Sequence, residues 1–423
     1  MKPVPHPFRI PDFRNYVVTR WTMTLAQYAM VLIIGYQAYD LARSELGLSV
    51  QDASAWLGLL GLLQFLPLFL LTPITGWVAD HYDRLLIARL TLVLQLSCAV
   101  TLGAVTLAGA MHLPVLLVIA VLLGVARAFA GPAYSAIAPN LVPKASLPTA
   151  IALSSIAWQT GAIAGPAIGG VAYAIRPDFA YWAAAALFSV AFVFLWQVSP
   201  LKRRPAPSKA HPITQVAEGL RYVAGNKVVL GAITLDLFAV LLAGATALLP
   251  VYARDILKVG PTGLSQLAAA PAVGASIVAL VFSIRPLKSN VGPKMLGAVV
   301  VFGLATVVFG LSTSMVLSLV TLAIAGAADM FSVYVRQSLI QLATPDDKRG
   351  RVSAVSGLTI SASNELGEAE SGFLAYAMGP VFAVVAGGIG AIVVTLTWAA
   401  LFPALRRAKR FEDDMETQVK EPT

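Results

Sequence analysis

Charged side chains are scarce in this sequence. Only 12% of its 423 residues are Asp, Glu, Lys or Arg, whereas 58% are hydrophobic, and the mean hydropathy is +0.77. Soluble domains carry about twice this share of charge, and a packed protein core could not bury so much apolar surface. The scarcity of charge therefore excludes a soluble globular protein and predicts that lipid is the solvent for much of the chain.

Cysteine and histidine are also rare. Cys98 is the single cysteine and lies in an apolar stretch, which excludes a disulfide or a cysteine metal site within one chain. The sequence has no G-x-x-x-x-G-K-[ST] phosphate loop, so ATP is not expected to drive it, and no Ser/His/Asp arrangement is placed for hydrolysis within the membrane. We therefore expect no enzyme, no metal and no cofactor. None of the four histidines is expected at mid-membrane, which argues against a histidine proton relay; they are His6, His81, His112 and His211.

Long apolar runs, by contrast, are abundant. Because an α-helix rises about 1.5 Å per residue, a bilayer span needs about 20 apolar residues. We expect twelve such spans, separated by Pro, Gly or charge, as at Pro177-Asp178 and Gly379-Pro380. They cover about 17–42, 54–79, 86–110, 113–138, 147–175, 179–198, 228–253, 261–284, 293–312, 315–342, 352–378 and 380–402.

Most basic residues lie in connections on one predicted side of the membrane. With both termini cytoplasmic, the inside segments hold 24 of the 30 Lys and Arg residues, and the outside loops hold 4. This ratio fits the positive-inside rule and an even number of spans. The basic residues of the inside segments thus explain the net charge of +9 as a topology signal, and nucleic acid is not expected as a partner. Residues 1–14 lack the features of a signal peptide, so insertion is expected to begin with the first span.

The chain is expected to consist of two similar halves. A shift of 202 positions aligns Pro143 with Pro345 and Gly165 with Gly367, which indicates a weak internal repeat. Duplicated halves place a binding site on their pseudo-symmetry axis near the bilayer midplane. The longest connection carries Lys202-Arg203-Arg204 and an amphipathic stretch, as expected for a segment on the anionic leaflet. We predict an N-terminal six-helix bundle over 1–198, a cytoplasmic linker over 199–227, a C-terminal six-helix bundle over 228–402 and a cytoplasmic tail over 403–423.

The connection between the second and third spans carries a spaced set of glycine and charge. It runs from Gly76 through Asp80 and Asp83 to Arg84 and resembles the G-x-x-x-D-x-x-x-R signature of the major facilitator superfamily. The resemblance implies that Asp80 meets the N-terminal end of span 11, where a helix dipole favours a carboxylate, and that Arg84 pairs with nearby acids. These four residues would then close the cytoplasmic side. A generic charged turn that obeys the positive-inside rule is the alternative.

The fifth span is rich in glycine. Its Gly161, Gly165, Pro166, Gly169 and Gly170 follow a pattern that is similar to the glycine-rich signature of the superfamily's antiporters. The implied role is a bend and a tight contact that seal a cavity during exchange, and ordinary close helix packing is the alternative. The resemblance extends over nearly the whole chain. It implies an all-α integral membrane protein with twelve transmembrane helices in two pseudo-symmetric six-helix bundles, which is the major facilitator fold.

Finer features are similar to the branch that contains enterobactin exporters and macrolide-efflux proteins. Asp83 stands where many members of the superfamily have glycine. The stretches 235–240, 249–253 and 362–368 also resemble this branch. The resemblance implies export of a siderophore or a drug.

Seven ionisable residues lie within the expected spans. Each would cost about 2.5–3.5 kcal/mol if it faced lipid, so these residues are expected to face the bundle or water. The acids exceed the bases by three, so some acids are expected to hold a proton in at least one state, as a proton-coupled carrier requires. The excess also favours neutral or cationic cargo. The seven are Arg127, Asp236, Asp329, Arg336, Glu365, Glu368 and Glu370.

Spacing suggests roles for these charges. Glu365 and Glu368 are three residues apart on one helix face, where two adjacent carboxylates resist simultaneous ionisation. Arg127, which resembles the superfamily's buried span-4 arginine, is expected to be the charge partner of Asp329 across the pseudo-axis. Asp329 and Arg336 share a face of span 10 but are too far apart for a direct pair. A static network that fixes helix packing is the alternative. The expected proton-coupling residues are Glu365, Glu368, Asp329 and Asp236, and their charge partners are Arg127, Arg336 and Glu370.

The pattern as a whole predicts a secondary active transporter. It would export a small amphipathic molecule by proton-coupled alternating access, as a monomer in the lipid of a bacterial inner membrane. An uptake carrier or lipid flippase on the same fold is one alternative. A receptor or assembly partner without transport is another, although the longest loop, of 29 residues, offers little soluble surface. Polar and aromatic residues near the expected cavity are candidates for substrate contact, with an interfacial or packing role as the alternative for each; they are Gln27, Tyr28, Tyr36, Trp158 and Gln159.

Overall fold

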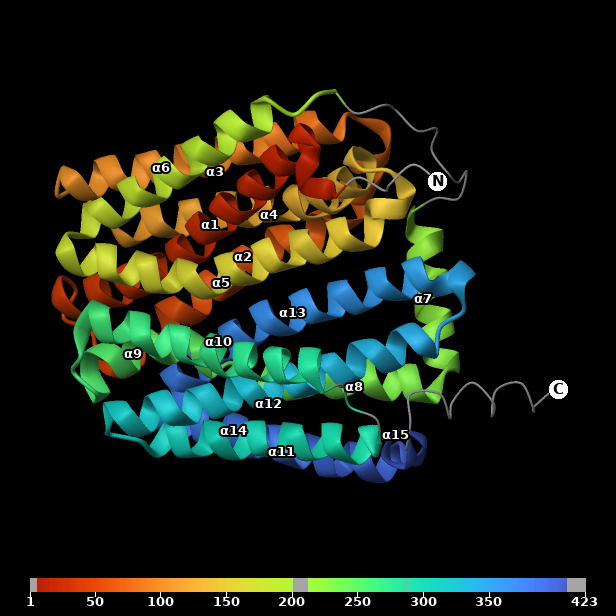
Figure 1. The fold of residues 1–423 in the computed structure, drawn as a ribbon. Helices are drawn as coiled ribbons and strands as arrows, with labels where there is room; N and C mark the ends of the chain where they lie inside the picture. Colours follow the sequence, from red (N-terminus) through yellow and green to blue (C-terminus); the bar gives the residue numbers. More distant parts are fainter. Residues whose placement is uncertain (1–5, 201–211, 286, 288, 409–423) are drawn as a thin grey trace. The chain divides into compact units, whose positions relative to one another are not determined.

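The computed structural model describes residues 6–200, 212–285, 287 and 289–408, and every regular element in these ranges is a helix (Figure 1). The predicted all-α class is confirmed. The basic stretch Lys202-Arg203-Arg204 and the tail after residue 408 lie outside the described residues. The helices are α1 (Pro11–Ser44), α2 (Val50–His81), α3 (Arg84–Leu107), α4 (Leu113–Leu141), α5 (Leu147–Ile175), α6 (Pro177–Trp196), α7 (Pro212–Gly225), α8 (Lys227–Leu242), α9 (Leu249–Val251), α10 (Gly260–Ile284), α11 (Val291–Leu311), α12 (Met315–Leu342), α13 (Asp346–Met378), α14 (Pro380–Leu401) and α15 (Pro403–Arg407).

The number of long helices agrees with the expected number of spans. Within the described ranges, eleven segments are both long and apolar enough to cross a bilayer, one of which runs from Lys227 to Ile256. The remaining expected span, 352–378, lies in α13, whose 33 residues would reach about 50 Å. Its acids leave α13 without an apolar stretch of the required length. Eleven apolar segments and this polar helix together make twelve.

The helix boundaries follow from proline and from capping side chains. Proline occupies the first turn of α1, α4, α5, α6 and α14, where its missing N–H removes no helical hydrogen bond. Asp83 caps α3 by accepting a hydrogen bond from the N–H of Leu85 at 2.9 Å. Asn226 caps α8 by accepting from Val228 and Val229 at 3.1 and 3.2 Å.

The seventh span is discontinuous. α8 ends at Leu242, a 3-10 turn covers Ala245–Leu248, and a π-helical turn covers Tyr252–Ile256. Gly244 lies in the break, where an added Cβ would come 2.3 Å from the carbonyl oxygen of Gly367 in α13. Only a residue without a side chain allows the two backbones to approach so closely.

The chain divides into two compact units. Unit 1 comprises Met1–Gly47, Leu63–Lys209 and Val259–Ala269, and unit 2 comprises Leu48–Leu62, Ala210–Lys258 and Ala270–Thr423. The first part of α2 therefore belongs to unit 2 and the first part of α10 to unit 1. The predicted domain limits at 198 and 228 stay predictions.

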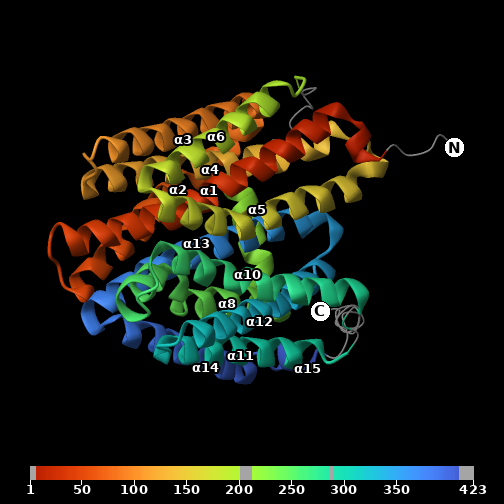
Figure 2. The same ribbon diagram turned by 60° about the vertical axis from the view of Figure 1, so that its left-hand side comes forward.

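Unit 1 is built around α1, which packs against α5 and α6 (Figure 2). Its interior contains polar contacts as well as apolar ones. Tyr181 of α6 donates a hydrogen bond to the amide oxygen of Gln37 at 2.5 Å, and Thr19 donates to the carbonyl oxygen of Ala191 at 3.2 Å. These bonds satisfy buried polar groups that lipid could not.

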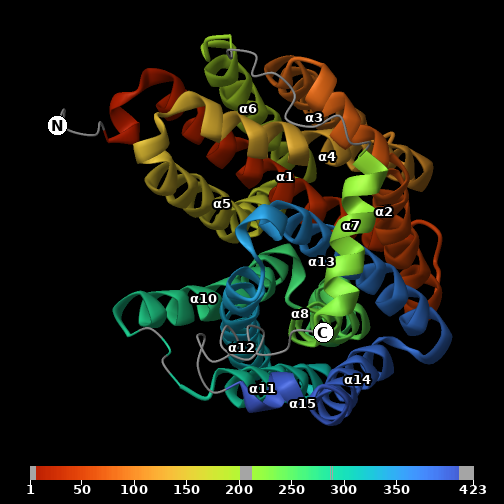
Figure 3. The same cartoon turned by 90° about the vertical axis from the view of Figure 1, so that its right-hand side faces the viewer.

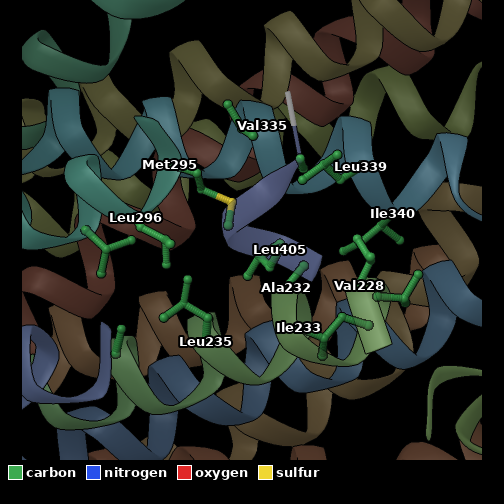
Figure 4. Close-up of a cluster of buried hydrophobic side chains, with 14 of the residues drawn as sticks. Val228, Ala232, Ile233, Leu235, Met295, Leu296, Val335, Leu339, Ile340 and Leu405 are labelled. Carbon is green, nitrogen blue, oxygen red and sulfur yellow. The ribbon is translucent and has the colours of Figure 1, made fainter. Parts of the chain in front are cut away.

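Unit 2 has an apolar core where α8, α11, α12 and α15 meet (Figure 4). Val335 and Leu339 of α12 are fully buried there, as are Met295 of α11 and Leu405 of α15. The same helices carry the charged residues considered below, so these charges are held by a closely packed frame.

The amphipathic stretch of the predicted linker forms α7, which runs crosswise to the long helices of unit 2 (Figure 3). Glu218 forms an ion pair with Arg351 of α13 at 2.8 Å. Tyr222 donates a hydrogen bond to the carbonyl oxygen of Ala343 at 2.8 Å, and the Lys348 ammonium lies 5.0 Å from the centre of its ring. α7 is therefore attached to the start of α13.

Candidate functional site

A pair of buried charges lies between α8 and α12 in unit 2. Arg336 donates a hydrogen bond from Nη1 to Oδ1 of Asp236, and the two side chains form an ion pair while only 5% and 6% exposed. Asp329, two turns before Arg336 in α12, lies within electrostatic range of both. Arg336 is thus bonded to one carboxylate, and the second, Asp329, is half-buried; we call these three residues the α8–α12 charge cluster (Asp236, Asp329 and Arg336).

The pairing of Asp236 with Arg336 follows from their positions along antiparallel helices. Asp236 lies nine residues after the start of α8, and Arg336 lies six residues before the end of α12. These separations correspond to about 14 and 9 Å, so the two side chains reach similar depths. The sequence analysis listed both residues without pairing them. Their similar depth was the signal that could have predicted this ion pair.

The remaining acids of the predicted site lie on α13. Glu365 is buried, whereas Glu368 and Glu370 are half-buried. The Ser371 hydroxyl lies 3.5 Å from a carboxylate oxygen of Glu370. Gly61 of α2 lies close to this segment: a Cβ added to Gly61 would lie 3.2 Å from Cβ of Glu368. All five acids predicted within spans therefore belong to unit 2. Of the two predicted bases, Arg336 belongs to unit 2 and Arg127 to unit 1.

The predicted gate is described in part. Asp83 caps α3, and Arg84 is its first residue. Gly76 and Asp80 fall within α2, but the placement of their side chains lies outside what is described. The cap gives Asp83 a local structural function. The expected closure of the cytoplasmic side by these residues stays a prediction.

The glycines of the fifth span lie against α1. An added Cβ would come 2.8 Å from Cβ of Thr24 at Gly161, 2.6 Å from the carbonyl oxygen of Leu25 at Gly165, and 2.8 Å from Cβ of Ala29 at Gly169. At Gly170 it would overlap the hydroxyl of Ser265 in α10, and the neighbouring Pro166 is buried inside α5. These glycines thus allow α5 to pack closely, which is the alternative given in the sequence analysis. The proposed role of the motif in exchange stays a prediction.

The weaker substrate candidates divide into two groups. The rings of Tyr28 and Trp158 lie 6.2 Å apart in an edge-to-face arrangement, and Tyr36 meets Tyr173 at 5.5 Å. Trp158 is 39% exposed and Tyr36 is buried. Gln27 is half-buried and Gln159 is exposed. The structure therefore brings Tyr28 and Trp158 together, across α1 and α5.

Comparisons with known proteins agree with this architecture. The family described as "Transmembrane secretion effector" matches residues 7–423. The enterobactin exporter EntS of Escherichia coli O1:K1 / APEC is 27% identical over 223 residues, which are 52% of this chain and 53% of the relative. The chain thus spans about half the length of the curated relatives it matches.

Solved structures show the same fold. The nucleoside transporter NupG aligns with a TM-score of 0.71 at 11% identity, over 92% of this chain and 100% of that chain. The D-xylose-proton symporter aligns with a TM-score of 0.70 at 13% identity, over 93% and 98%. The predicted major facilitator fold is confirmed.

Proposed function

We infer that this chain, which belongs to the transmembrane secretion effector family of the major facilitator superfamily, exports a small amphipathic molecule by proton-coupled alternating access. The family and the fold are those of transporters, and the chain is a multi-pass membrane protein. We place it in a bacterial inner membrane, as a monomer with both termini cytoplasmic. The matched enterobactin exporter supports the outward direction and a siderophore or a drug as cargo.

The α8–α12 charge cluster carries the proposal of proton coupling. Arg336 compensates one carboxylate, and it is bonded to Asp236. A second carboxylate, Asp329, lies within range of the same guanidinium. Because one guanidinium cannot neutralise two carboxylates, we take the gain or loss of a proton by this cluster as the coupling step. Exposure to water on one side of the membrane would allow the proton to leave, which couples proton movement to the change of state.

The acids of α13 are proposed as further members of the coupling system. Glu365 is buried, and Glu368 lies one turn further along the same face. Gly367, between them, is packed against the backbone of Val240 and Leu241 in α8. α13 and α8 are therefore in direct backbone contact, so a change at one acid-bearing helix is transmitted to the other by close packing.

Inverted membrane vesicles that contain the protein test the proposal. Uptake of a macrolide and of a catecholate siderophore is measured with and without an imposed pH gradient. We expect that a gradient drives uphill uptake by the wild type. Asp329→Asn and Glu368→Gln should lose this uptake but retain exchange of labelled for unlabelled substrate, because exchange needs no net proton movement.

Glu218→Gln is the control, since it removes an acid from α7, outside the expected spans, and should leave gradient-driven uptake intact. Gradient-driven uptake in both Asp329→Asn and Glu368→Gln would show that these acids do not couple transport to protons. Uptake that depends on the opposite gradient direction would show an importer.

A further inference from the structure

We propose that unit 1 holds a binding site for an oxyanion between α1 and α4, formed by the guanidinium of Arg20 and the hydroxyl of Tyr134. The inference deepens the proposed function, because it assigns an anionic group to the transported molecule. Arg20 lies within α1, about 14 Å from the start of the helix.

Arg20 and Tyr134 face one another. The guanidinium carbon of Arg20 lies 5.7 Å from the centre of the Tyr134 ring, and the tyrosine hydroxyl is within electrostatic range of the guanidinium. Tyr16, one helical turn before Arg20, donates a hydrogen bond to the carbonyl oxygen of Tyr134 at 3.0 Å. Two residues on one face of α1 thus contact Tyr134, Tyr16 at its backbone carbonyl and Arg20 over its ring.

Two donor groups of this pair lack an acceptor among the described residues. The Nε–H of Arg20 and the hydroxyl of Tyr134 are both buried, and neither finds a hydrogen-bond partner among the described residues. Tyr134 is 0% exposed. Buried donors are normally satisfied, and a pair that is left unsatisfied inside a packed unit indicates an acceptor supplied from elsewhere.

Among the described side chains, the helices around Arg20 supply no carboxylate to it; the side chain of Asp80 in α2 lies outside what is described. The sequences of α3, α4 and α5 contain no Asp or Glu. On α1, Asp12 is eight residues away and accepts hydrogen bonds from Ser199, and Asp40 is twenty residues away, or about 30 Å. On α6, Asp178 is bonded to Arg176. The acceptor that fits a guanidinium fork beside a hydroxyl is therefore a carboxylate or phosphate oxygen from a ligand.

A second arginine extends this positive region. Arg127 lies seven residues before Tyr134 on α4, which is two turns along the same face or about 10 Å. The excess of acids that favoured neutral or cationic cargo belongs to unit 2, whereas unit 1 carries these two cations.

Binding of a matched pair of probes to the purified protein tests the site. The probes are 1-naphthoate and its neutral amide, 1-naphthamide, measured by equilibrium dialysis in a phosphate-free detergent. We expect the wild type to bind the naphthoate about tenfold more tightly, as for one charge-assisted contact. Arg20→Gln should remove the preference, Arg20→Lys should retain part of it, and Tyr134→Phe should reduce it while keeping the ring.

Arg89→Gln is the matched control. Arg89 also lies in unit 1 over an aromatic ring, 4.6 Å from that of Trp196, but its Nη2 donates to the carbonyl oxygens of Leu195, Trp196 and Val198 at 3.3–3.5 Å. The Nε–H of Arg89 is also buried without a partner among the described residues, but its Nη2 has acceptors and its ring partner is a tryptophan, which has no hydroxyl, so its removal should leave the preference for naphthoate unchanged. Equal binding of both probes by the wild type, or an unchanged preference in Arg20→Gln, overturns the proposal. If Arg20→Gln does not fold, an unchanged preference in Tyr134→Phe has the same meaning.

Added dioleoylphosphatidylglycerol distinguishes the source of the oxyanion. Competition with naphthoate would assign the site to a lipid phosphate and overturn the assignment of an anionic group to the cargo, whereas absence of competition supports that assignment. The measurement involves neither a pH gradient nor transport. Failure of proton coupling in the vesicle experiment is therefore separable from failure of this site.

Discussion

An added Cβ on Gly372 of α13 would lie 2.2 Å from the backbone nitrogen of Gly58 in α2. The two helices of unit 2 therefore touch through their backbones at this crossing, as small residues allow in membranes. Replacement of Gly372 by Leu should force the helices apart and destabilise the protein by about 2 kcal/mol or more. The midpoint of thermal unfolding in detergent measures the effect.

Gly357 provides the control for this prediction, because it lies in the same helix and an added Cβ would meet nothing within 4 Å. Gly357→Leu should change the unfolding midpoint little. Equal destabilisation by the two variants would mean that the α2–α13 crossing does not depend on glycine.

Gln95 of α3 is 1% exposed, and neither its amide oxygen nor its amide nitrogen has a hydrogen-bond partner among the described residues. Such a group loses its hydration without compensation, at about 1–3 kcal/mol. Gln95→Leu should therefore stabilise the protein by an amount of this order, measured as the shift of the unfolding midpoint.

Gln37 offers the opposite case, because its amide oxygen accepts a hydrogen bond from Tyr181. Gln37→Leu should destabilise the protein by leaving a buried tyrosine hydroxyl unsatisfied. Destabilisation by both substitutions would indicate that Gln95 has a partner that satisfies it in the membrane.

Removal of one member of the Asp236–Arg336 pair should be severe. Asp236→Ala leaves a buried guanidinium whose bonded carboxylate is gone, at a cost of about 3–5 kcal/mol. The double variant Asp236→Ala with Arg336→Met should be more stable than Asp236→Ala alone, since no buried charge of this pair remains. A double-mutant cycle on unfolding midpoints measures the coupling. Additive effects of the two substitutions would show that the pair contributes no mutual stabilisation.

The attachment of α7 should depend more on Tyr222 than on Glu218. The ion pair from Glu218 to Arg351 is about 40% exposed on both sides, and pairs of this kind contribute only about 0–1 kcal/mol and are screened by salt. Tyr222→Phe removes a part-buried hydrogen bond and should cost about 1 kcal/mol. The two variants are compared by their unfolding midpoints at low and high salt, where only the effect of Glu218→Gln should diminish.

The sequence was sufficient for the positions of the helices, because length and apolar composition are local properties. The twelve expected spans correspond to helices, and α13 was expected in spite of its acids. The break after Leu242 was not predicted. It depends on the contact of Gly244 with Gly367, two residues that are 123 positions apart.

The site was predictable as a set of residues but not as a set of contacts. Hydropathy identified Asp236, Asp329 and Arg336 as charges inside spans, whereas their grouping requires the rotation and depth of two helices. Arg20 was missed as a site residue for a different reason. It lies near the end of an apolar stretch, where an arginine is usually a topology signal, and only its burial against Tyr134 indicates otherwise.

Asp236 and Arg336 are separated by 100 positions in the chain. A ribosome that adds about 5–20 residues per second completes Arg336 about 5–20 s after Asp236. Throughout this interval the nascent α8 carries a carboxylate that hydrocarbon solvates poorly. We therefore expect α8 to stay beside the translocon, or against earlier helices, until α12 arrives. α8 and α12 would then enter the lipid together, so the helices of unit 2 would insert in a different order from that of their synthesis.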